Sequence, residues 1–273
     1  MKKLISVFVG LMLVLSIFTG CANKETADKK ESSDQFDAIK KKGEVVVGFD
    51  NTFVPMGFKD EKGDTVGFDI DLAKEVFKRV GIEVKFQPID WSMKETELNT
   101  GKIDLIWNGY TITDERKEKV AFTNPYLENR QVIITLAGSK VKTKEDLKGA
   151  KVATQSGSSS LEAINAEADL AAAFDGGKPV LFENYTQALM DLEVKRVDAV
   201  VADEILARYY INERGADKYA VLEDNFGDEE YGIGVRKSDK KLLEAVQKAM
   251  DEMKADGTSA EISKKWFAEN IIK

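Results

Sequence analysis

The sequence predicts a mixed α/β protein with two similar lobes, each built on a mostly parallel sheet flanked by helices. Two observations support this prediction. Short apolar runs typical of buried strands alternate with segments whose apolar residues recur at helical spacing. The same order of elements then occurs a second time along the chain. Alternating strands and helices favour parallel pairing, because each helix carries the chain back to the start of the next strand.

The two occurrences of the pattern can be followed element by element. In the first, strands alternate with helices in the order strand 45–49, helix 67–80, strand 84–86, helix 93–99 and strand 103–107. In the second, the expected order is strand 151–154, helix 161–174, strand 180–182, helix 186–193 and strand 197–201. Apolar positions recur at helical spacing over 242–253 and 262–267, which predicts two C-terminal helices.

The last unit of each occurrence has the same spacing. Segments 98–104 and 192–198 both begin with leucine and end with aspartate, and the expected strand ends shortly afterwards, at Gly109 and at Asp203. Ligands of open α/β sheets bind beyond the carboxyl ends of the strands. We therefore expect residues 108–116 and Asp203 to meet across a cleft.

The N-terminus has the features of a lipoprotein signal. Two lysines, an apolar run over 4–18 and the triplet Thr19-Gly20-Cys21 are typical of a secretory signal peptide over residues 1–20. Cys21 is the only cysteine and lies where a lipobox carries its lipid, although Phe18 replaces the commoner leucine. The alternative is a chance cysteine in a signal peptide. Residues 22–35 lack large apolar side chains, so the lipidated cysteine and a flexible tether are expected over 21–37.

The composition excludes several classes of function. Histidine is absent and only one thiol is present, which excludes catalytic triads and zinc sites that depend on histidine. A formal net charge of −8 is a poor match for nucleic acid. The glycines of YGIGVRK lie in an apolar strand pattern and do not open a helix. We therefore expect no cofactor, no metal ion and no nucleic acid partner, and we expect a monomer.

An anion site is predicted where the last strand of the first lobe ends. Gly109 lets a ligand approach the backbone, and Thr111 adds a hydroxyl group. A helix that begins at Thr113 or Asp114 supplies unpaired N–H groups, and Arg116 on its first turn suits a carboxylate. The alternative is an ordinary connection with a solvated arginine.

The second lobe carries a similar junction and an acid. The N–H groups over 157–160 would contribute to the same carboxylate pocket, although Ser159 and Glu162 have capping-box spacing and would also suit a serine-rich turn. Asp203 follows an apolar strand, where it would cap the next helix or pair with an ammonium group. Together, Arg116 and Asp203 would hold an amino acid zwitterion.

Two loops that follow strands carry aromatic residues beside an acid. Phe53 and Trp91 are expected to contact a ligand side chain, while Asp50 would face its polar tip. Core packing is the alternative for each aromatic residue, and it is more plausible for Phe58 than for the other two.

These motifs resemble those of the extracellular solute-binding proteins of bacterial ABC importers for polar amino acids, family three. The resemblance covers residues 40–273. It rests on the following segments, which occur in the same order as in that family: VVVGFDNTFVPMGF, DEKGDTVGFDIDLAKEV, GKIDLIWNGYTITDERKEKVAFTNPY, LKGAKVATQSGSSS, RVDAVVADE, YGIGVRK and KADGTSAEISKKWF.

The resemblance implies a type II, periplasmic-binding-protein-like fold whose two lobes close on the ligand by a hinge. Lobe 1 would comprise residues 38–129 and 232–273, and lobe 2 would comprise residues 130–231. The chain would cross between them near 128–131 and 231–237.

The resemblance also implies roles for individual residues. The residues that would bind the ligand carboxylate are Gly109, Thr111, Arg116, Ser158 and Ser159. Asp203 would bind the α-ammonium group. Those implied for the side-chain end are Asp50, Phe53, Trp91 and Asn108. The chain departs from the family pattern at Met56, Trp107 and Asn108, which would change the shape of the side-chain pocket.

The implied function is capture of a free polar amino acid, such as arginine, lysine, histidine or glutamine, for delivery to an ABC permease and its ATPase. The protein would be extracytoplasmic and lipid-anchored to the outer face of the cell membrane. One alternative is an enzyme on the same scaffold, like a cyclohexadienyl dehydratase, with Glu95, Glu97 or Asp50 as its general acid. Another is a receptor that signals or adheres without transport.

Overall fold

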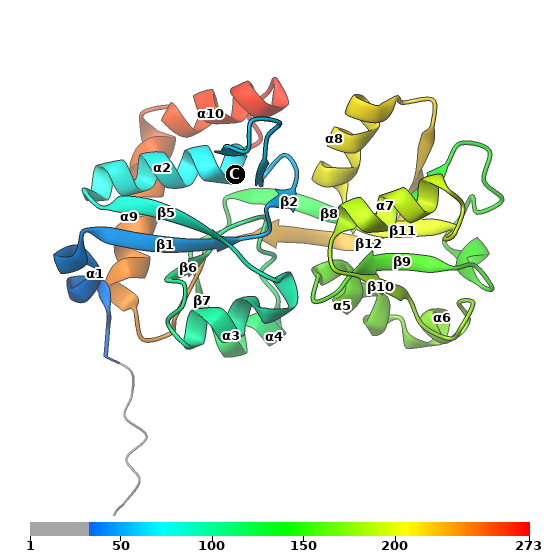
Figure 1. Ribbon diagram of the computed structural model, residues 1–273, viewed down its shortest axis with the longest axis horizontal. Coiled ribbons are helices and arrows are strands. Elements are labelled where there is room, and N and C mark those ends of the chain that lie inside the picture. The colour runs from blue at the N-terminus through cyan, green and yellow to red at the C-terminus, as the bar shows by residue number, and fades with distance from the viewer. Residues whose placement is uncertain (1–32) are drawn as a thin grey trace, which may run out of the picture. The chain divides into compact units, whose positions relative to one another are not determined.

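The computed structural model describes residues 33–273, which form two five-stranded sheets and one three-stranded sheet with flanking helices (Figure 1). The predicted signal peptide, Cys21 and most of the predicted tether lie outside the described residues. Helix α1 (Phe36–Lys42) begins inside the range predicted for the tether, which is therefore wrong at its last two residues. The reason is that Phe36 and Ile39 are buried in the first hydrophobic core. Within residues 33–273, no helix is both long and apolar enough to cross a membrane.

The first sheet has the strand order β5-β1-β6-β13-β7. Its strands, in that order, are β5 (Glu83–Pro88), β1 (Glu44–Phe49), β6 (Leu105–Ile106), β13 (Gly234–Val235) and β7 (Ala121–Phe122). Strand β1 pairs in parallel with β5 and β6, whereas β13 is antiparallel to both of its neighbours. Figure 1 shows α2 (Phe68–Val80) and α10 (Thr258–Phe267) on one face, and α3 (Lys94–Asn99) and α4 (Asp114–Lys119) on the other. Helix α9 (Lys240–Ala255) packs against α2 and α10.

The second sheet has the strand order β10-β9-β11-β8-β12. Its strands are β10 (Val180–Phe182), β9 (Val152–Gln155), β11 (Ala199–Asp203), β8 (Leu127–Leu136) and β12 (Tyr219–Tyr231). Strand β9 pairs in parallel with β10 and β11, and β8 is antiparallel to β11 and β12. Helices α7 (Tyr185–Glu193) and α8 (Glu204–Arg214) cover one face (Figure 1). The other face carries α5 (Ser159–Ala166) and α6 (Ala168–Ala172), where the sequence predicted one longer helix.

Short elements complete the chain. The small sheet consists of β2 (Thr52–Phe53), β3 (Gly57–Lys59) and β4 (Thr65–Val66), paired in antiparallel order. Two single turns of 3₁₀ helix, η1 (Trp91–Met93) and η2 (Glu145–Leu147), lie in connections.

The segments 98–104 and 192–198, which share their spacing, form equivalent hydrogen bonds in the two sheets. The Asp104 carboxylate accepts from the backbone N–H of Val46 (3.0 Å), and the Asp198 carboxylate accepts from that of Lys151 (2.8 Å). The N–H groups of the two aspartates donate back to the carbonyl oxygens of the same residues, at 2.7 and 2.8 Å. Each aspartate thus ties the third parallel strand of its sheet to the first strand, which explains the spacing shared by 98–104 and 192–198.

Strands β8 and β12 join the two sheets. They are antiparallel from the pair Leu136 and Tyr219 to the pair Leu127 and Tyr231, with two register shifts between. The chain leaves the first sheet through β8 and returns to it after β12. An isolated bridge between Thr111 and Tyr231 continues this connection into the first sheet.

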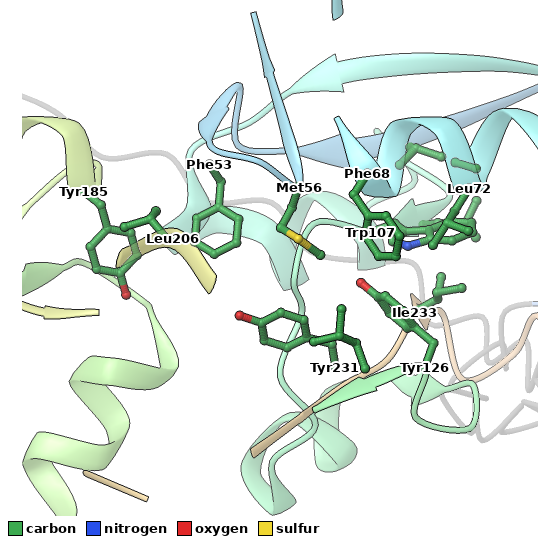
Figure 2. Packing of buried hydrophobic residues seen from close by; sticks show 14 of the residues in the cluster. Phe53, Met56, Phe68, Leu72, Trp107, Tyr126, Tyr185, Leu206, Tyr231 and Ile233 are labelled. Atoms are coloured by element: carbon green, nitrogen blue, oxygen red, sulfur yellow. The ribbon is translucent and has the colours of Figure 1, made fainter. Parts of the chain in front are cut away.

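A single hydrophobic cluster extends from the first sheet to the second. Figure 2 shows Met56 and Trp107 packed in it near Phe68, while Tyr185 of α7, which covers the second sheet, lies on the far side of Phe53. Met56 and Trp107 are completely buried, so both side chains belong to this core.

Arg236 holds the loops of the first sheet together. The side chain is almost completely buried, and it forms ion pairs with Asp104 (2.8 Å) and Asp239 (2.6 Å). Its Nη1 atom also donates to the carbonyl oxygens of Leu98 (3.1 Å) and Ile103 (2.6 Å). Arg236 therefore fixes the segment that leads into β6.

We predict that Arg236→Ala lowers the free energy of unfolding by about 3–5 kcal/mol, because it leaves two acids and two carbonyl groups without their partner. Urea denaturation would measure the change. Arg196→Ala is the control, since its pair with Asp191 is exposed and should contribute about 1 kcal/mol or less. Equal losses in the two variants would contradict the role given to Arg236.

Candidate functional site

A pocket with about 260 Å³ of empty space lies between the carboxyl ends of the two sets of parallel strands. Its first-sheet side is lined by Asp50, Phe53, Trp91, Asn108, Gly109 and Arg116. Its second-sheet side is lined by Gln155, Ser158, Ser159, Tyr185 and Asp203. Every residue predicted to bind the ligand lines this pocket except Thr111, which is buried beside it.

Arg116 is held with its guanidinium group at the pocket. Helix α4 begins as expected, with the Thr113 hydroxyl accepting from the backbone N–H of Arg116 (3.2 Å). The Nη1 atom of Arg116 donates to the carbonyl of Thr111 (3.0 Å), and the guanidinium lies 4.9 Å from the centre of the Tyr110 ring. On the second-sheet side, Nε and Nη2 lie 3.0 and 2.9 Å from Glu162 Oε1. These contacts fix the guanidinium plane without using all five of its N–H groups.

The structure differs from the sequence prediction of a capping box at Ser159 and Glu162. The hydroxyl that caps α5 belongs to Ser158, which accepts from the backbone N–H of Leu161 (3.1 Å). The capping box predicted for Ser159 and Glu162 is therefore wrong, because the helix begins one residue earlier than that pattern requires. Glu162 faces Arg116 instead.

The backbone at Gly109 is positioned from behind by a buried acid. Its N–H donates to Asp69 Oδ2 (2.7 Å), and the Tyr126 hydroxyl donates to Asp69 Oδ1 (2.8 Å). Burial raises the pKa of Asp69 to about 7 despite these two donors. Gly109 has φ = +57°, and a Cβ atom there would lie 2.7 Å from the Phe53 ring, so the turn needs glycine.

Two hydroxyl groups meet where the two sheets approach each other. The Thr111 hydroxyl lies 2.9 Å from the Ser159 hydroxyl and 2.9 Å from Glu229 Oε1. Ser158 Oγ donates to the carbonyl of Gln155 (2.8 Å) while it caps α5. The structure therefore brings the predicted hydroxyl groups of both lobes to the same end of the pocket as Arg116.

Asp203 does not act as a helix cap. It occupies the N-cap position of α8, but its carboxylate forms no capping hydrogen bond. Asp203 Oδ1 instead accepts from the Tyr231 hydroxyl (2.6 Å), Asn129 Nδ2 (2.8 Å) and Gln131 Nε2 (3.0 Å). The capping alternative is therefore wrong, and the carboxylate is held at the pocket by neutral donors.

Asp50 is the second acid that lines the pocket. Its Oδ1 atom accepts from the backbone N–H and hydroxyl of Thr52, at 2.8 and 2.6 Å, and its Oδ2 atom accepts from Gln155 Nε2 (2.7 Å) across the pocket. Burial raises the pKa of Asp50, and these donors only partly oppose that effect. Asn108 supports the same loop, because its Oδ1 atom accepts from the backbone N–H of Asp50 (3.0 Å).

Aromatic rings enclose the side-chain end of the pocket. Figure 2 shows Phe53 beside Tyr185, and their ring centres are 6.1 Å apart. Trp91 packs at right angles to Tyr110 at 5.9 Å. Both predicted aromatics are also buried in the hydrophobic core, so they line the pocket and pack at the same time. Phe58 does not line the pocket, and its ring packs on Trp266.

Four residues at or beside the pocket were not predicted from the sequence. They are Lys94, Gln155, Tyr185 and Glu229. Gln155 is the last residue of β9, as Asp203 is of β11, and Tyr185 lies three residues after β10, so both lie at the strand ends where ligands are expected. Lys94 joins the two sheets by donating to the carbonyl of Gly157 (2.8 Å), and burial lowers the pKa of its ammonium group to about 8.

The arrangement suits binding of a small charged molecule. Arg116 offers donors at one end of the pocket, and Asp203 and Asp50 offer buried carboxylates elsewhere in it. Among the described residues, no group of three or more acidic side chains is arranged to hold a metal ion.

Comparisons with known proteins agree with this geometry. A family model for bacterial extracellular solute-binding proteins, family 3, matches residues 45–269. The chain is 31% identical to the L-cystine-binding protein TcyJ of Escherichia coli (strain K12), with 97% of this chain and 96% of that protein covered. It is 33% identical to the ABC transporter glutamine-binding protein GlnH of Bacillus subtilis (strain 168), with 99% of each covered.

A solved structure extends the comparison to the fold. The chain is similar to an ABC uptake transporter substrate-binding protein from Streptococcus pneumoniae with bound histidine, at a TM-score of 0.85 and 40% identity. The match covers 88% of this chain and 98% of that one. The predicted two-lobed α/β fold is therefore confirmed. All three relatives are described with an amino acid as their ligand, and none of the three is described as an enzyme.

We predict that Gly109→Ala destabilises the protein more than Gly101→Ala. Both glycines have positive φ, so alanine should cost about 1–2 kcal/mol at either position. Only position 109 has a close neighbour, the Phe53 ring, and this overpacking should cost about 1–3 kcal/mol more. Urea denaturation would compare the variants, and equal losses would contradict the packing described for Gly109.

Proposed function

Because the chain belongs to family 3 of the bacterial extracellular solute-binding proteins, we propose that it captures one polar amino acid between its two lobes and delivers it to an ABC importer. The observation that carries the proposal is that Arg116, on α4 beside the first sheet, and Asp203, at the end of β11 in the second sheet, line one pocket. A cationic fork and a carboxylate are the complementary groups for an amino acid zwitterion. An ordinary surface pair would not be buried in this way, since Arg116 is 2% exposed and Asp203 is 3% exposed.

The α-carboxylate end of the ligand is assigned to Arg116. The contacts of Arg116 with Glu162, Thr111 and the carbonyl of Gly157 leave one guanidinium N–H for the ligand. The hydroxyl groups of Thr111, Ser158 and Ser159 would complete this half of the site, while Gly109 shapes the turn beside it, since its N–H is held by Asp69. Both lobes contribute to it, so the carboxylate would be enclosed only when the lobes meet.

The α-ammonium end is assigned to Asp203. Within residues 33–273, this carboxylate has no ion pair with lysine or arginine, although it is buried. Burial of an unpaired charge is unfavourable, so a cationic ligand group would stabilise the site. Because Arg116 and Asp203 belong to different lobes, a ligand that binds both favours the closed arrangement.

The ligand side chain is assigned to the region of Asp50, Phe53, Trp91 and Tyr185, with Asn108 supporting the loop. The Asp50 carboxylate would pair with the cationic tip of arginine, lysine or histidine, or accept hydrogen bonds from the amide of glutamine. The relatives bind single amino acids and also cystine, which is roughly twice as large.

The proposed lobes follow the two sheets. Residues 38–129 with 232–273 would form lobe 1, and residues 130–231 would form lobe 2, with β8 and the segment after β12 as the crossings. Hydrogen bonds such as Gln155 to Asp50 and Lys94 to Gly157 already join the lobes, as in a closed arrangement.

The enzymatic alternative has little support in the site. Glu95 pairs with Lys94 (3.3 Å) and accepts from the Tyr110 hydroxyl (2.9 Å), and Glu97 lies near Gln87. Neither glutamate lines the pocket. Asp50 does line it, and its carboxylate is assigned to the ligand side chain.

A thermal-shift screen of the common amino acids and cystine would test the proposed function. A ligand present at 100 times its Kd should stabilise the protein by about 2.7 kcal/mol through mass action. We expect a polar amino acid to give the largest shift. No shift with any amino acid, at concentrations that saturate the relatives, would contradict the proposal.

We predict that Arg116→Ala weakens binding of the best amino acid by about 1.5–3 kcal/mol, because it removes charge-assisted hydrogen bonds to the carboxylate. Isothermal titration calorimetry would measure the loss. Lys117→Ala is the matched control, since the next residue of α4 is exposed and pairs only with Asp114. Unchanged affinity in a folded Arg116→Ala variant would show that the carboxylate site is assigned wrongly.

We also propose that the mature chain begins at Cys21 and is held by lipid on the outer face of the cell membrane. Cys21→Ser should abolish lipid attachment, because the thiol is the only group that can carry the lipid there. Partition into detergent and the mass of the mature protein would report the change. Membrane retention of the variant equal to that of the native chain would contradict the anchor.

A further inference from the structure

Two carboxylates share hydrogen-bond donors beside the pocket. Asn129 Nδ2 lies 2.8 Å from Asp203 Oδ1 and 2.7 Å from Glu229 Oε1. Gln131 Nε2 lies 3.0 and 2.8 Å from the same two oxygens. Both amides come from β8, Asp203 ends β11, and Glu229 lies on β12. The strand order β11-β8-β12 therefore places the two acids on either side of β8, where both accept from the same two amides.

The other groups around this pair are also uncharged. The Tyr231 hydroxyl donates to Asp203 (2.6 Å), and the Thr111 hydroxyl lies 2.9 Å from Glu229 Oε1. The nearby charged side chains have other partners. On β8, Arg130 pairs with Glu204, and on β12, Glu230 pairs with Lys273. In residues 33–273, neither member of the acid pair forms an ion pair with lysine or arginine.

Two adjacent carboxylates without a cation cannot both ionise easily at neutral pH. Each negative charge disfavours the other, and removal from water disfavours both. Burial and the neighbouring charge of Asp203 raise the pKa of Glu229 to about 8, although Asn129 and Gln131 oppose the shift by donating hydrogen bonds. A single proton bound between the two acids would relieve the repulsion and let one carboxyl group donate to the other.

We infer that Glu229 is a positioning residue of the ammonium subsite, sharing one proton with Asp203 until the ammonium group of the ligand displaces it. This inference rests on the proposed function. The exchange is balanced, because one O–H bond breaks, the proton leaves to solvent, and the ammonium group takes over compensation of the two carboxylates. Glu229 acts through Asp203, since it does not itself line the pocket.

The exchange makes affinity depend on pH in a defined direction. In the unliganded protein, burial and the nearby Asp203 charge raise the pKa of Glu229 to about 8, so binding below that pH must expel the proton that Glu229 shares. Affinity should therefore rise with pH between 6 and 8, by up to about tenfold per pH unit. At pH 7, binding should release close to one proton.

Calorimetry with L-arginine and L-glutamine tests this exchange, since neither side chain titrates near pH 7. Titrations in phosphate and in Tris, whose ionisation enthalpies differ, give the number of protons released. We expect close to one for the native protein and for the control Glu230→Gln, which alters the neighbouring residue on the same strand. For Glu229→Gln we expect binding without proton release and with little dependence on pH between 6 and 8.

The outcomes separate this inference from the proposed function. Binding without proton release in the native protein would overturn the inference and leave the function intact. Equal proton release in Glu229→Gln would overturn it as well, because another group would then be the source. Absence of binding by both amino acids would count against the proposed function for these ligands.

A titration without ligand tests the inference if neither amino acid binds, and also if Glu229→Gln fails to fold. Carbon-13 NMR of the carboxyl groups of the native protein would follow Glu229 from pH 4 to pH 9. A midpoint well above the ordinary value of about 4.3 supports the shared proton. A midpoint at or below about 5 overturns it.

Discussion

The antiparallel pairing of β8 with β12 is the constraint on which the site depends. These strands lie side by side at the edge of the second sheet, and the chain enters that sheet through one and leaves it through the other. Their register sets Asn129 opposite Glu229. The pairing of β8 with β11 then sets Gln131 opposite Asp203. Two ladders thus place four polar side chains around one point, and a shift of one residue in either ladder would turn them to the other face.

Two of the three charged side chains that line the pocket have partners across it. Arg116 on α4 faces Glu162 on α5, and Asp50 accepts from Gln155. Buried charges without such partners would be costly, so these contacts favour an arrangement in which the sheets approach each other. A zwitterion would add to them by joining Arg116 to Asp203. In this account, the same electrostatic requirement that brings the lobes together selects the ligand.

Features set by local pattern could be predicted from the sequence, whereas those set by long-range register could not. Strand ends follow from apolar runs, and parallel sheets bind ligands at those ends, so Arg116 and Asp203 could be found. Glu162 was misassigned because the helix start moved by one residue, a change that local propensity does not resolve. Glu229 lies within a long irregular strand, and nothing nearby in sequence reveals that β8 carries its partners. The sequence around Tyr185 predicts only the start of a helix, and the contact of its ring with Phe53 depends on the tertiary fold.

The pairing of Arg116 with a ligand carboxylate and of Asp203 with a ligand ammonium group can be tested by removing each ligand group in turn. The measurement is the affinity of the best amino acid, its deaminated analogue and its decarboxylated analogue for the native protein, Arg116→Ala and Asp203→Asn. Loss of the amino group should weaken binding strongly in the native protein and only slightly in Asp203→Asn. Loss of the carboxylate should weaken binding strongly in the native protein and only slightly in Arg116→Ala. If each analogue lost the same free energy of binding in the variants as in the native protein, the zwitterion would not be held by these two residues.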